Sequence, residues 1–331
     1  MGTIFVVTGA NGHLAGTIIR YLRTRNCQVR GLILPYEENT DVSNVRYYKG
    51  DITDKESLGP LFSHGGNDEM IVIHAAGIVS LQKKHSPEML RVNVDGTRNV
   101  IQACLENKVK RLLYVSSVHA IPEGNGKDPI RETGHFSEDA VKGSYSRTKA
   151  IASQMVLDAG AKGLDVVIVH PSGIYGPFDT GRNHITQMII DYMEDRLRFG
   201  IKGGYDFVDV RDVAKGCIAV AEKGRSGECY ILSNRYISVP ALLEFLSLET
   251  GGRKIRSVPS WLAKLILPVI RLLGRVSGSR SLITGFSLDV LRSNVRFSHS
   301  KATLELEYVP RSMEDTVRDT LRYLKTGECM L

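Results

Sequence analysis

Residues 3–16 read TIFVVTGANGHLAG, and this stretch decides the fold of the chain. Its first part, Thr3–Val7, is apolar and rich in β-branched residues, which is typical of a buried parallel strand. Gly9 and Gly12 follow at once, and apolar residues with helical spacing begin at Leu14. A strand, a glycine-bearing turn and a helix form the first unit of a dinucleotide-binding fold. Glycine lets the backbone approach a pyrophosphate, and the helix N-terminus attracts it.

The glycine pattern has one departure. The third position of Gly-x-x-Gly-x-x-Gly is Ala15, and Gly16 comes one place late. That position serves the close packing of helix against strand, for which alanine is small enough. The departure therefore leaves the prediction of a dinucleotide site intact.

A second motif, about 130 residues later, has the chemistry that the glycine turn lacks. Tyr145 and Lys149 stand four residues apart on an expected helix from Ser144 to Ala159, so both side chains share one face. A free tyrosine has a pKa near ~10 and is a poor base at neutral pH. A nearby ammonium group favours the phenolate, so we expect Lys149 to lower the pKa of Tyr145 and let it exchange a proton with an alcohol or alkoxide.

A serine completes this set. The apolar run Leu112–Val115 is expected to form a buried strand, and it ends in Ser116 and Ser117. Ligands of open α/β sheets bind beyond the carboxyl ends of the strands. We expect the hydroxyl of Ser117, in preference to Ser116, to hold the substrate oxygen while Tyr145 handles the proton.

With these motifs the chain resembles the extended short-chain dehydrogenases/reductases over nearly all of its length. Five further fragments occur in the order typical of that family. They are Gly50–Asp54, His74–Gly77, Asn93–Asn99, His170–Pro177 and Phe207–Ala214. Each fragment is weak alone, but seven in order are specific.

The resemblance implies a Rossmann-type, doubly wound parallel sheet of the α/β class, with a smaller, mostly helical C-terminal substrate lobe. It implies a site whose catalytic residues are Ser117, Tyr145 and Lys149. It also implies that Asp51 and Ile52 lie near the adenine and that Lys149 contacts the nicotinamide ribose. The implied cofactor-binding residues are Gly9, Asn11, Gly12, His13, Leu14, Asp51, Ile52, Ala75, Ala76, Gly77, Tyr145, Lys149, Pro171, Ser172, Gly173 and Ile174.

The branch of the family is indicated by the tail and by two departures. Residues 301–310 and 319–324 resemble the dihydroflavonol-reductase-like and 3β-hydroxysteroid-dehydrogenase-like members. Dehydratases carry an Asp-Glu pair where this chain has Val118 and His119, and sugar-nucleotide members usually show Arg and Asn where it has His170 and Gly173. His170 is interpreted as a buried, hydrogen-bonded histidine rather than a substrate ligand.

The alternation of strand and helix patterns predicts the domain organisation. Residues 1–177 form the expected dinucleotide-binding core, to which 206–235 return, and 178–205 with 236–331 form the expected substrate lobe. Strands are predicted near 3–8, 28–34, 45–49, 70–75, 111–116, 164–170 and 228–232. For the glycine- and proline-containing loop 122–142, two interpretations stay open, a cover over the active site and a simple surface connection.

Composition narrows the class of protein. Hydrophobic residues make up 42% and charged residues 24% of the chain, which is ordinary for a soluble globular protein. The five cysteines are scattered without a Cys-x-x-Cys, which predicts a reducing, cytoplasmic compartment and no metal site. We expect neither a signal peptide nor a membrane span. A homodimer is a family expectation.

Positive charge is concentrated between Arg253 and Lys301. This segment contains ten basic residues and one acidic residue, Asp289. Its net charge of +9 (10 − 1) exceeds the net charge of +7 of the whole chain. Three interpretations stay open: a lobe helix with a solvated basic face, a wall of a site for a large apolar or acidic substrate, and contact with a membrane surface. Nucleic acid is not an expected partner, because the stretch lacks interleaved aromatic residues suited to stacking.

The choice between NAD and NADP depends on the end of the second strand, where an acidic residue binds the ribose of NAD and an arginine the 2′-phosphate of NADP. Leu34 is neither, whereas Glu37 and Glu38 would repel a phosphate if they lie close. The sequence therefore leans to NAD.

These observations predict an NAD(P)-dependent oxidoreductase that interconverts a ketone and a secondary alcohol on a fairly large apolar small-molecule substrate, such as a steroid or flavonoid. A nucleotide-sugar epimerase with the same three residues is the first alternative. A catalytically silent dinucleotide sensor is the second, although a sensor has no need of Tyr145.

Overall fold

The computed structural model describes residues 2–64, 68–79, 86–124, 128–180, 183–259, 261–262 and 296–331. Most of the basic segment discussed above, from 263 to 295, lies outside the described residues.

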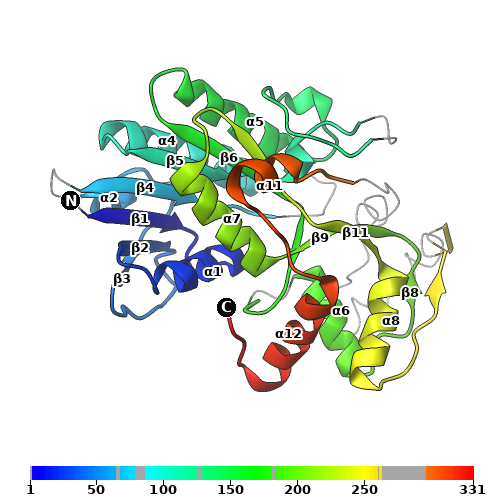
Figure 1. Ribbon diagram of the computed structural model, residues 1–331. Helices are drawn as coiled ribbons and strands as arrows, with labels where there is room; N and C mark the ends of the chain where they lie inside the picture. Colours follow the sequence, from blue (N-terminus) through cyan, green and yellow to red (C-terminus); the bar gives the residue numbers. More distant parts are fainter. Residues whose placement is uncertain are drawn as a thin grey trace.

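The centre of the molecule is a seven-stranded sheet in the order β10-β6-β5-β4-β1-β2-β3, in which every neighbouring pair is parallel. Figure 1 shows its strands side by side. The strands are β1 (Thr3–Thr8), β2 (Gln28–Ile33), β3 (Val45–Lys49), β4 (Glu69–His74), β5 (Arg111–Val115), β6 (Val166–Pro171) and β10 (Cys229–Leu232). The predicted doubly wound parallel sheet is confirmed, and each strand expected in it begins and ends within two residues of the prediction.

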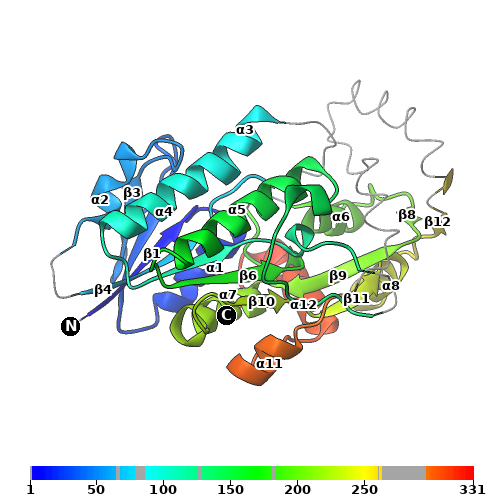
Figure 2. The ribbon, with the colours of Figure 1, turned by 90° about the horizontal axis from the view of Figure 1, so that it is seen from above.

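Helices cover both faces of this sheet, as an all-parallel sheet requires (Figure 2). The helices α4 (Thr97–Glu106) and α5 (Ser144–Gly160) bury Val100 and Val156 against one face. On the other face, α1 (His13–Leu22) and α7 (Val210–Lys223) bury Ile18 and Ile218. Each fully buried aliphatic side chain stabilises the fold by about 1.5–3 kcal/mol relative to exposure. Short helical segments connect these elements: α2 (Gly59–Phe62) and the single 3-10 turns Glu56–Leu58, Val118–Ala120 and Glu138–Ala140. Before α4, α3 (Pro87–Leu90) continues through a π-helical segment, Arg91–Gly96, directly into that helix.

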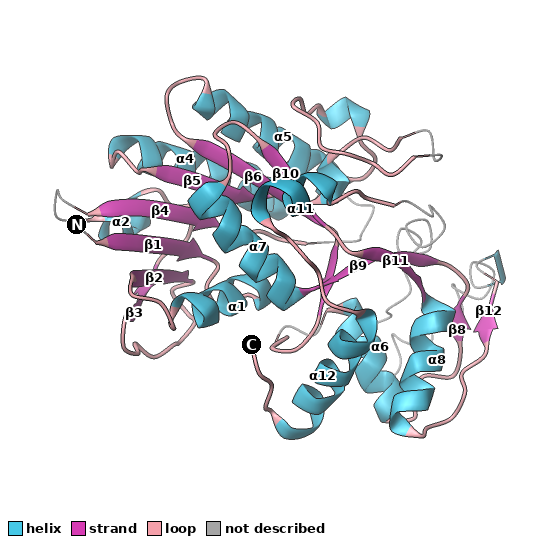
Figure 3. Ribbon diagram, in the orientation of Figure 1, coloured by secondary structure: helices cyan, strands magenta, loops and turns pink. Residues whose placement is uncertain are grey.

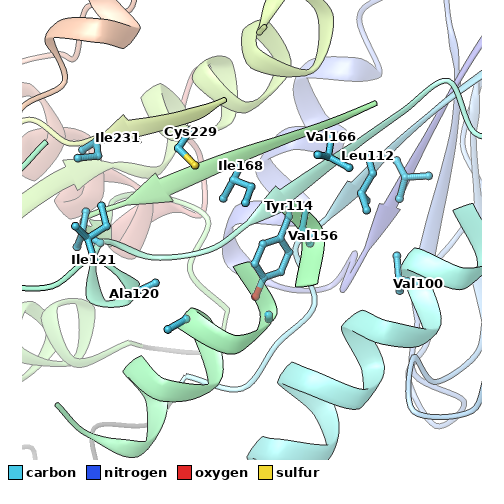
Figure 4. Close-up of a cluster of buried hydrophobic side chains, with 14 of the residues drawn as sticks. Val100, Leu112, Tyr114, Ala120, Ile121, Val156, Val166, Ile168, Cys229 and Ile231 are labelled. Carbon is cyan, nitrogen blue, oxygen red and sulfur yellow. The ribbon is translucent and has the colours of Figure 1, made fainter. Parts of the chain in front are cut away.

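Tyr114 lies in the core between β5 and α5, and Figure 4 shows it within a cluster of aliphatic side chains. Val100, Val156 and Ile168 belong to the same cluster. The Tyr114 ring is fully buried, so its hydroxyl needs a partner inside the protein. Its position on β5, three residues before Ser117, places that hydroxyl next to the candidate site.

Beyond the carboxyl ends of the central strands lies a three-stranded sheet in the order β11-β9-β7. Figure 3 shows its strands β9 and β11 as magenta arrows. It consists of β7 (Gly173–Tyr175), β9 (Gly204–Asp209) and β11 (Arg235–Ser238), with β9 parallel to β7 and antiparallel to β11. The remaining elements are α6 (His184–Met193), β8 (Gly200–Ile201), α8 (Val239–Thr250), β12 (Ser257–Val258), α11 (Ser300–Leu306) and α12 (Met313–Thr326). Figure 1 shows α6, α8 and α12 gathered on this side of the molecule. The division into core and substrate lobe stays a prediction.

Buried charges connect α7 to the C-terminal part of the chain. The guanidinium of Arg211, 2% exposed, donates to Asp209 at 2.8 and 3.0 Å, pairs with Asp319 at 2.8 Å and donates to the carbonyl of Met330 at 3.1 Å. Arg311 pairs with the carboxylate of Asp212 at 2.9 Å. A buried arginine is tolerated when its donors are paired in this way. The motif that contains Arg211 was quoted above without a role, and here it anchors α12.

The loop 122–142 is attached to distant parts of the chain in its described part. Ile130 forms a bridge with Phe297, with backbone bonds of 2.8 Å to Arg296 and Ser298. Glu132 accepts from the backbone of Ile231 at 2.9 Å. These contacts hold the loop against β10 and the segment that follows residue 295.

The first testable prediction concerns Gly9, which has φ +70°. A Cβ there would lie 2.9 Å from the Cα of Ala76, so Gly9→Ala combines a left-handed backbone with a backbone clash. We expect Gly9→Ala to lower the free energy of unfolding by about 2 kcal/mol or more, measured by urea titration. Gly59→Ala is the matched control, because a Cβ there meets nothing within 4 Å in a helical backbone, and it should be neutral or stabilising. Equal effects of the two variants would contradict this reading of the turn.

Candidate active site

The glycine turn after β1 has the geometry that a pyrophosphate requires. Gly9 takes a positive φ, and the amide of Gly12 closes the turn on the Gly9 carbonyl at 2.8 Å. Helix α1 then begins at His13, and no side chain caps its N-terminus. The amides of the first helical turn have no intrahelical partner, and its first turn has no acidic residue. The turn therefore fits an anionic dinucleotide phosphate.

Thr8 joins the glycine turn to the end of β4. Its hydroxyl oxygen accepts from the amides of Ala75 and Ala76, both at 3.1 Å, and contacts Nδ1 of His74 at 2.8 Å. The other ring nitrogen of His74 contacts the hydroxyl of Thr97 at 3.1 Å. Burial lowers the pKa of His74 to about 3, so it is neutral at physiological pH. This network brings the glycine turn and Ala75–Gly77 together at one edge.

The remaining turn residues make internal contacts with their side chains. The ring of His13 contacts the carbonyl of Pro177 at 2.7 Å, and burial lowers its pKa. Leu14 is buried in the core. The side-chain oxygen of Asn11 accepts from Asn39 at 2.8 Å. The side chains of His13 and Leu14 are thus held inside the protein, and their role toward a dinucleotide stays a prediction.

Asp51 and Ile52 follow β3 at the same edge of the sheet. The carboxylate of Asp51 accepts from the backbone and hydroxyl of Thr53 at 2.8 and 2.9 Å. Ile52 is buried, and its carbonyl accepts from Asn99 at 2.8 Å. The two residues lie beyond the ends of β2 and β3, on the side of the sheet edge expected for the adenine.

The structure brings Ser117 and Tyr145 into contact. Ser117 follows β5 directly, and Tyr145 lies in the first turn of α5. A hydrogen bond between the two side chains favours the phenolate, but burial outweighs it and raises the pKa of Tyr145 to about 12. Both side chains are at most 7% exposed. The expected lowering of the tyrosine pKa by Lys149 is not found in this arrangement.

The reason lies in the partners of Lys149. Its ammonium donates to the hydroxyl of Tyr114 at 3.1 Å and to the carbonyl of Val115 at 2.8 Å. Burial lowers the pKa of Lys149 to about 7. A Cβ on Gly77 would lie 3.6 Å from its Nζ, so Lys149 also faces the segment after β4. Lys149 is thus a buried, desolvated amine next to the pair rather than a partner of Tyr145, and its pKa lies close to neutral pH.

Asn93 lies beside the candidate site, and the motif Asn93–Asn99 did not predict a role for it. Its side-chain oxygen accepts from the amide of Ile78 at 2.8 Å, and its nitrogen donates to the Ile78 carbonyl at 3.0 Å. The same nitrogen donates to the hydroxyl of Thr148 at 3.1 Å. Asn93 therefore fixes the segment after β4 to the helix that carries Tyr145 and Lys149. In the sequence, the only indication of this role is that Asn93 stands at the start of a helical pattern.

Pro171–Ile174 connect β6 to β7 at the same edge. The amide of Ser172 donates to the Leu232 carbonyl at 3.2 Å. A Cβ on Gly173 would lie 2.7 Å from the ring of Phe207, so glycine permits this close packing. His170 is fully buried, with Nδ1 3.0 Å from the carbonyl of Ser117 and its ring stacked on Phe136. This agrees with the interpretation of His170 as a buried, hydrogen-bonded residue.

Within the described residues, no three or more histidine, cysteine, aspartate or glutamate side chains are grouped so that they could hold a metal ion. No helix in the described part of the chain is long and apolar enough to cross a membrane.

Comparison with known proteins now assigns the family. Residues 5–233 match the model of the NAD dependent epimerase/dehydratase family. The chain belongs to this family. It is 28% identical over 330 residues to "Sterol demethylase protein B" of Methylococcus capsulatus, covering 97% of this chain and 98% of that protein. It is 26% identical over 332 residues to "Putative dihydroflavonol 4-reductase" of Synechocystis, covering 98% and 95%. The solved structure of gox2253 matches with a TM-score of 0.81 and 31% identity over 99% of both chains.

The predicted family and the predicted class, an NAD(P)-dependent dehydrogenase or reductase, are thereby confirmed. A nicotinamide dinucleotide is the cofactor of this family, and the glycine turn described above fits its phosphates.

The network around Thr8 generates a second prediction. Thr8→Val keeps the shape but leaves one nitrogen of the buried His74 and the part-buried amides of Ala75 and Ala76 without their partner. An unsatisfied buried donor costs about 1–3 kcal/mol, so we expect the free energy of unfolding to fall by at least about 2 kcal/mol. Urea titration measures it. Thr24→Val is the control, because the Thr24 hydroxyl donates at an exposed turn and its loss should cost less than about 0.5 kcal/mol. A Thr8 variant as stable as the control would refute the role of the network.

Proposed function

We propose that this protein interconverts a ketone and a secondary alcohol on a fairly large apolar substrate, with Ser117, Tyr145 and Lys149 as its catalytic residues. When bound, the nicotinamide supplies or accepts the hydride. Ser117 holds the substrate oxygen, and Tyr145 donates its phenolic proton to that oxygen in the direction of reduction. Lys149 supplies a buried positive charge and holds the ribose.

The observation that carries this proposal is the hydrogen-bonded contact of Ser117 with Tyr145 at the carboxyl end of β5. Two hydroxyl groups on rigid elements can bind one oxygen atom together, because each can donate to it. Since burial raises the pKa of Tyr145 to about 12, the phenol keeps its proton until a substrate oxygen takes it. The ammonium of Lys149 then stabilises negative charge in a site with little water.

Several features support an apolar substrate. Aromatic side chains of Tyr175, Tyr205 and Phe207 lie edge to face on the sheet that follows the central strands. The names of the two relatives refer to a sterol and to a dihydroflavonol, and both align with nearly the whole chain. We assign substrate recognition to the lobe formed by 178–205 and 236–331, and the dinucleotide to 1–177 with 206–235. A steroid- or flavonoid-like ketone fits this set of features.

A nucleotide-sugar epimerase would use the same three residues without net consumption of cofactor. Because the matching family includes epimerases by name, the activity test below distinguishes this alternative from a reductase. His119 stands where dehydratases carry an acidic pair, and burial lowers its pKa to about 4. His119 is not a carboxylic acid, and at neutral pH it carries no extra proton. It is therefore unsuited to protonate the hydroxyl group that leaves in a dehydratase reaction. A dinucleotide sensor would not need the contact of Ser117 with Tyr145. A cytoplasmic location and a homodimer remain predictions.

We further propose NAD as the preferred cofactor, because of the side chain of Glu37. Its carboxylate accepts from the amide of Leu34 at 2.9 Å, directly after β2. Asn39, two residues later, contacts Asn11 in the glycine turn. Arg30, in contrast, donates to the carbonyls of Leu61 and Ser63 at 2.8 and 2.6 Å. A negative charge after β2 disfavours a 2′-phosphate, and Arg30 has other partners.

The activity test uses Tyr145→Phe. Oxidation of NADH and of NADPH is followed by absorbance with a 3-oxo steroid, a flavanone and an aryl ketone. Wild-type protein should oxidise one molecule of cofactor for each molecule of alcohol formed. Tyr145→Phe should lower kcat by at least about a hundredfold, because the proton donor is lost, while cofactor affinity changes less than about threefold. Substantial turnover by Tyr145→Phe would refute the assignment. Tight cofactor binding without net consumption would favour the epimerase or the sensor.

Cofactor preference is tested with Glu37→Gln. The ratio of kcat/KM for NADH to that for NADPH should fall by about tenfold, because repulsion of the 2′-phosphate is removed. Glu38→Gln is the matched control, since Glu38 pairs with Lys49 and its side chain is 81% exposed. A preference for NADPH in the wild type, or equal changes in both variants, would contradict the role of Glu37.

A further inference from the structure

Beside Tyr145 lies a histidine that the proposed mechanism does not use. The ring of His119 meets the ring of Tyr145 edge to face, with centroids 6.1 Å apart and an interplanar angle of 75°. On its other side His119 stacks on Tyr205, with centroids 5.7 Å apart and an angle of 12°. One imidazole is therefore held between the tyrosine of α5 and a tyrosine of β9.

Tyr205 fixes the orientation of this imidazole. Its hydroxyl contacts Nε2 of His119 at 3.0 Å. The ring of Tyr205 is itself held edge to face by Phe207 at 5.7 Å and by Phe297 at 6.4 Å. It stands on β9, which pairs with β7 on one side and β11 on the other. Tyr205 is thus a buried ring on a rigid strand, and a side chain bonded to it has little freedom to rotate.

His119 also contacts the other half of the catalytic pair. Its backbone amide donates to Oγ of Ser117 at 3.2 Å. The Ser117 oxygen that accepts this bond has its own proton left to donate, and the Ser117–Tyr145 hydrogen bond favours the tyrosinate. His119 therefore touches Ser117 through its main chain and Tyr145 through its ring.

The imidazole is uncharged under ordinary conditions. Burial lowers its pKa to about 4, and the carboxylate of Glu123 opposes that shift. The aromatic and hydroxyl groups that face it, from Tyr145, Tyr205 and Ser117, are neutral at the same pH. His119 is accordingly suited to holding its neighbours in place rather than to exchanging protons with the substrate.

We infer that His119, fixed by the hydroxyl of Tyr205, is a positioning residue that sets the ring plane of Tyr145 and the hydroxyl direction of Ser117. The inference rests on the proposed function, because it assigns Tyr145 the proton transfer. It implies that a contact from β9 in the second sheet controls how well the donor on α5 is aligned. Small misalignments of a catalytic group lower kcat strongly, whereas they leave cofactor binding unchanged.

The kinetic test removes one hydroxyl. Tyr205→Phe keeps the stacked ring but loses the bond to His119, and we expect kcat to fall about tenfold with an unchanged affinity for NADH. The probe is a 3-oxo steroid, one of the ketones used in the activity test. Tyr192→Phe is the matched control, because its buried hydroxyl donates to the carbonyl of Arg253 at 3.0 Å and should leave kcat within about twofold.

A double-mutant cycle separates positioning from general packing. His119→Phe keeps a ring but removes the Nε2 atom that bonds to the Tyr205 hydroxyl. In that background Tyr205→Phe should cost no further kcat. The 13Cζ resonance of Tyr145, measured by NMR on protein with labelled tyrosines, gives a readout that needs no substrate. The resonance is assigned as the one that disappears from the spectrum of Tyr145→Phe. It should move in Tyr205→Phe and stay in place in Tyr192→Phe.

Two outcomes would overturn the inference: additive effects of the two variants on kcat, or an unmoved Tyr145 resonance with wild-type kcat in Tyr205→Phe. Failure of the proposed function has a different signature, because Tyr145→Phe itself would then retain turnover. The Tyr145 resonance still tests the contact in that case.

Discussion

The parallel pairing of β5 between β4 and β6 is the constraint on which the candidate site depends. His74 lies opposite Tyr114, and Val115 lies opposite Val169, so the three strands end at one edge. The segments that follow them carry Ala75–Gly77, Ser117 and Pro171–Ile174. Since backbone hydrogen bonds fix this register, side chains far apart in the sequence meet without any loop having to be placed precisely. Loss of this pairing would separate the dinucleotide turn from the proton donor.

The strands, the glycine turn and the position of Tyr145 and Lys149 on one helix could be predicted, because each rests on local sequence. Apolar β-branched runs predicted the strands within two residues, and the order of seven short motifs predicted the family, which is confirmed. The motif order also indicated that Ser117 and Tyr145 lie at the same edge of the sheet. Their catalytic roles stay a proposal, but their contact is an observed feature of the structure.

Partners of the site residues could not be predicted, because they depend on tertiary packing. Lys149 was expected to act on Tyr145, yet its ammonium donates to Tyr114 and Val115, and burial raises the pKa of Tyr145 to about 12. Nothing local in the sequence links Thr8 to His74, 66 residues away, or His119 to Tyr205, 86 residues away. Burial also decides the protonation of the three histidines, His74, His119 and His170, whose pKa values fall to about 3 or 4. The sequence shows that these three residues are histidines, but only the packing around them shows that they are neutral at physiological pH.

The most direct test of the account follows the hydride itself. Wild-type protein is incubated with a 3-oxo steroid and NADH that carries deuterium at the transferable position of the nicotinamide, and the product is examined by mass spectrometry and NMR. The account predicts one deuterium on the new carbinol carbon for each NADH consumed. Cofactor that binds tightly but is not consumed, or product without deuterium at that carbon, would contradict net hydride transfer between the nicotinamide and a ketone.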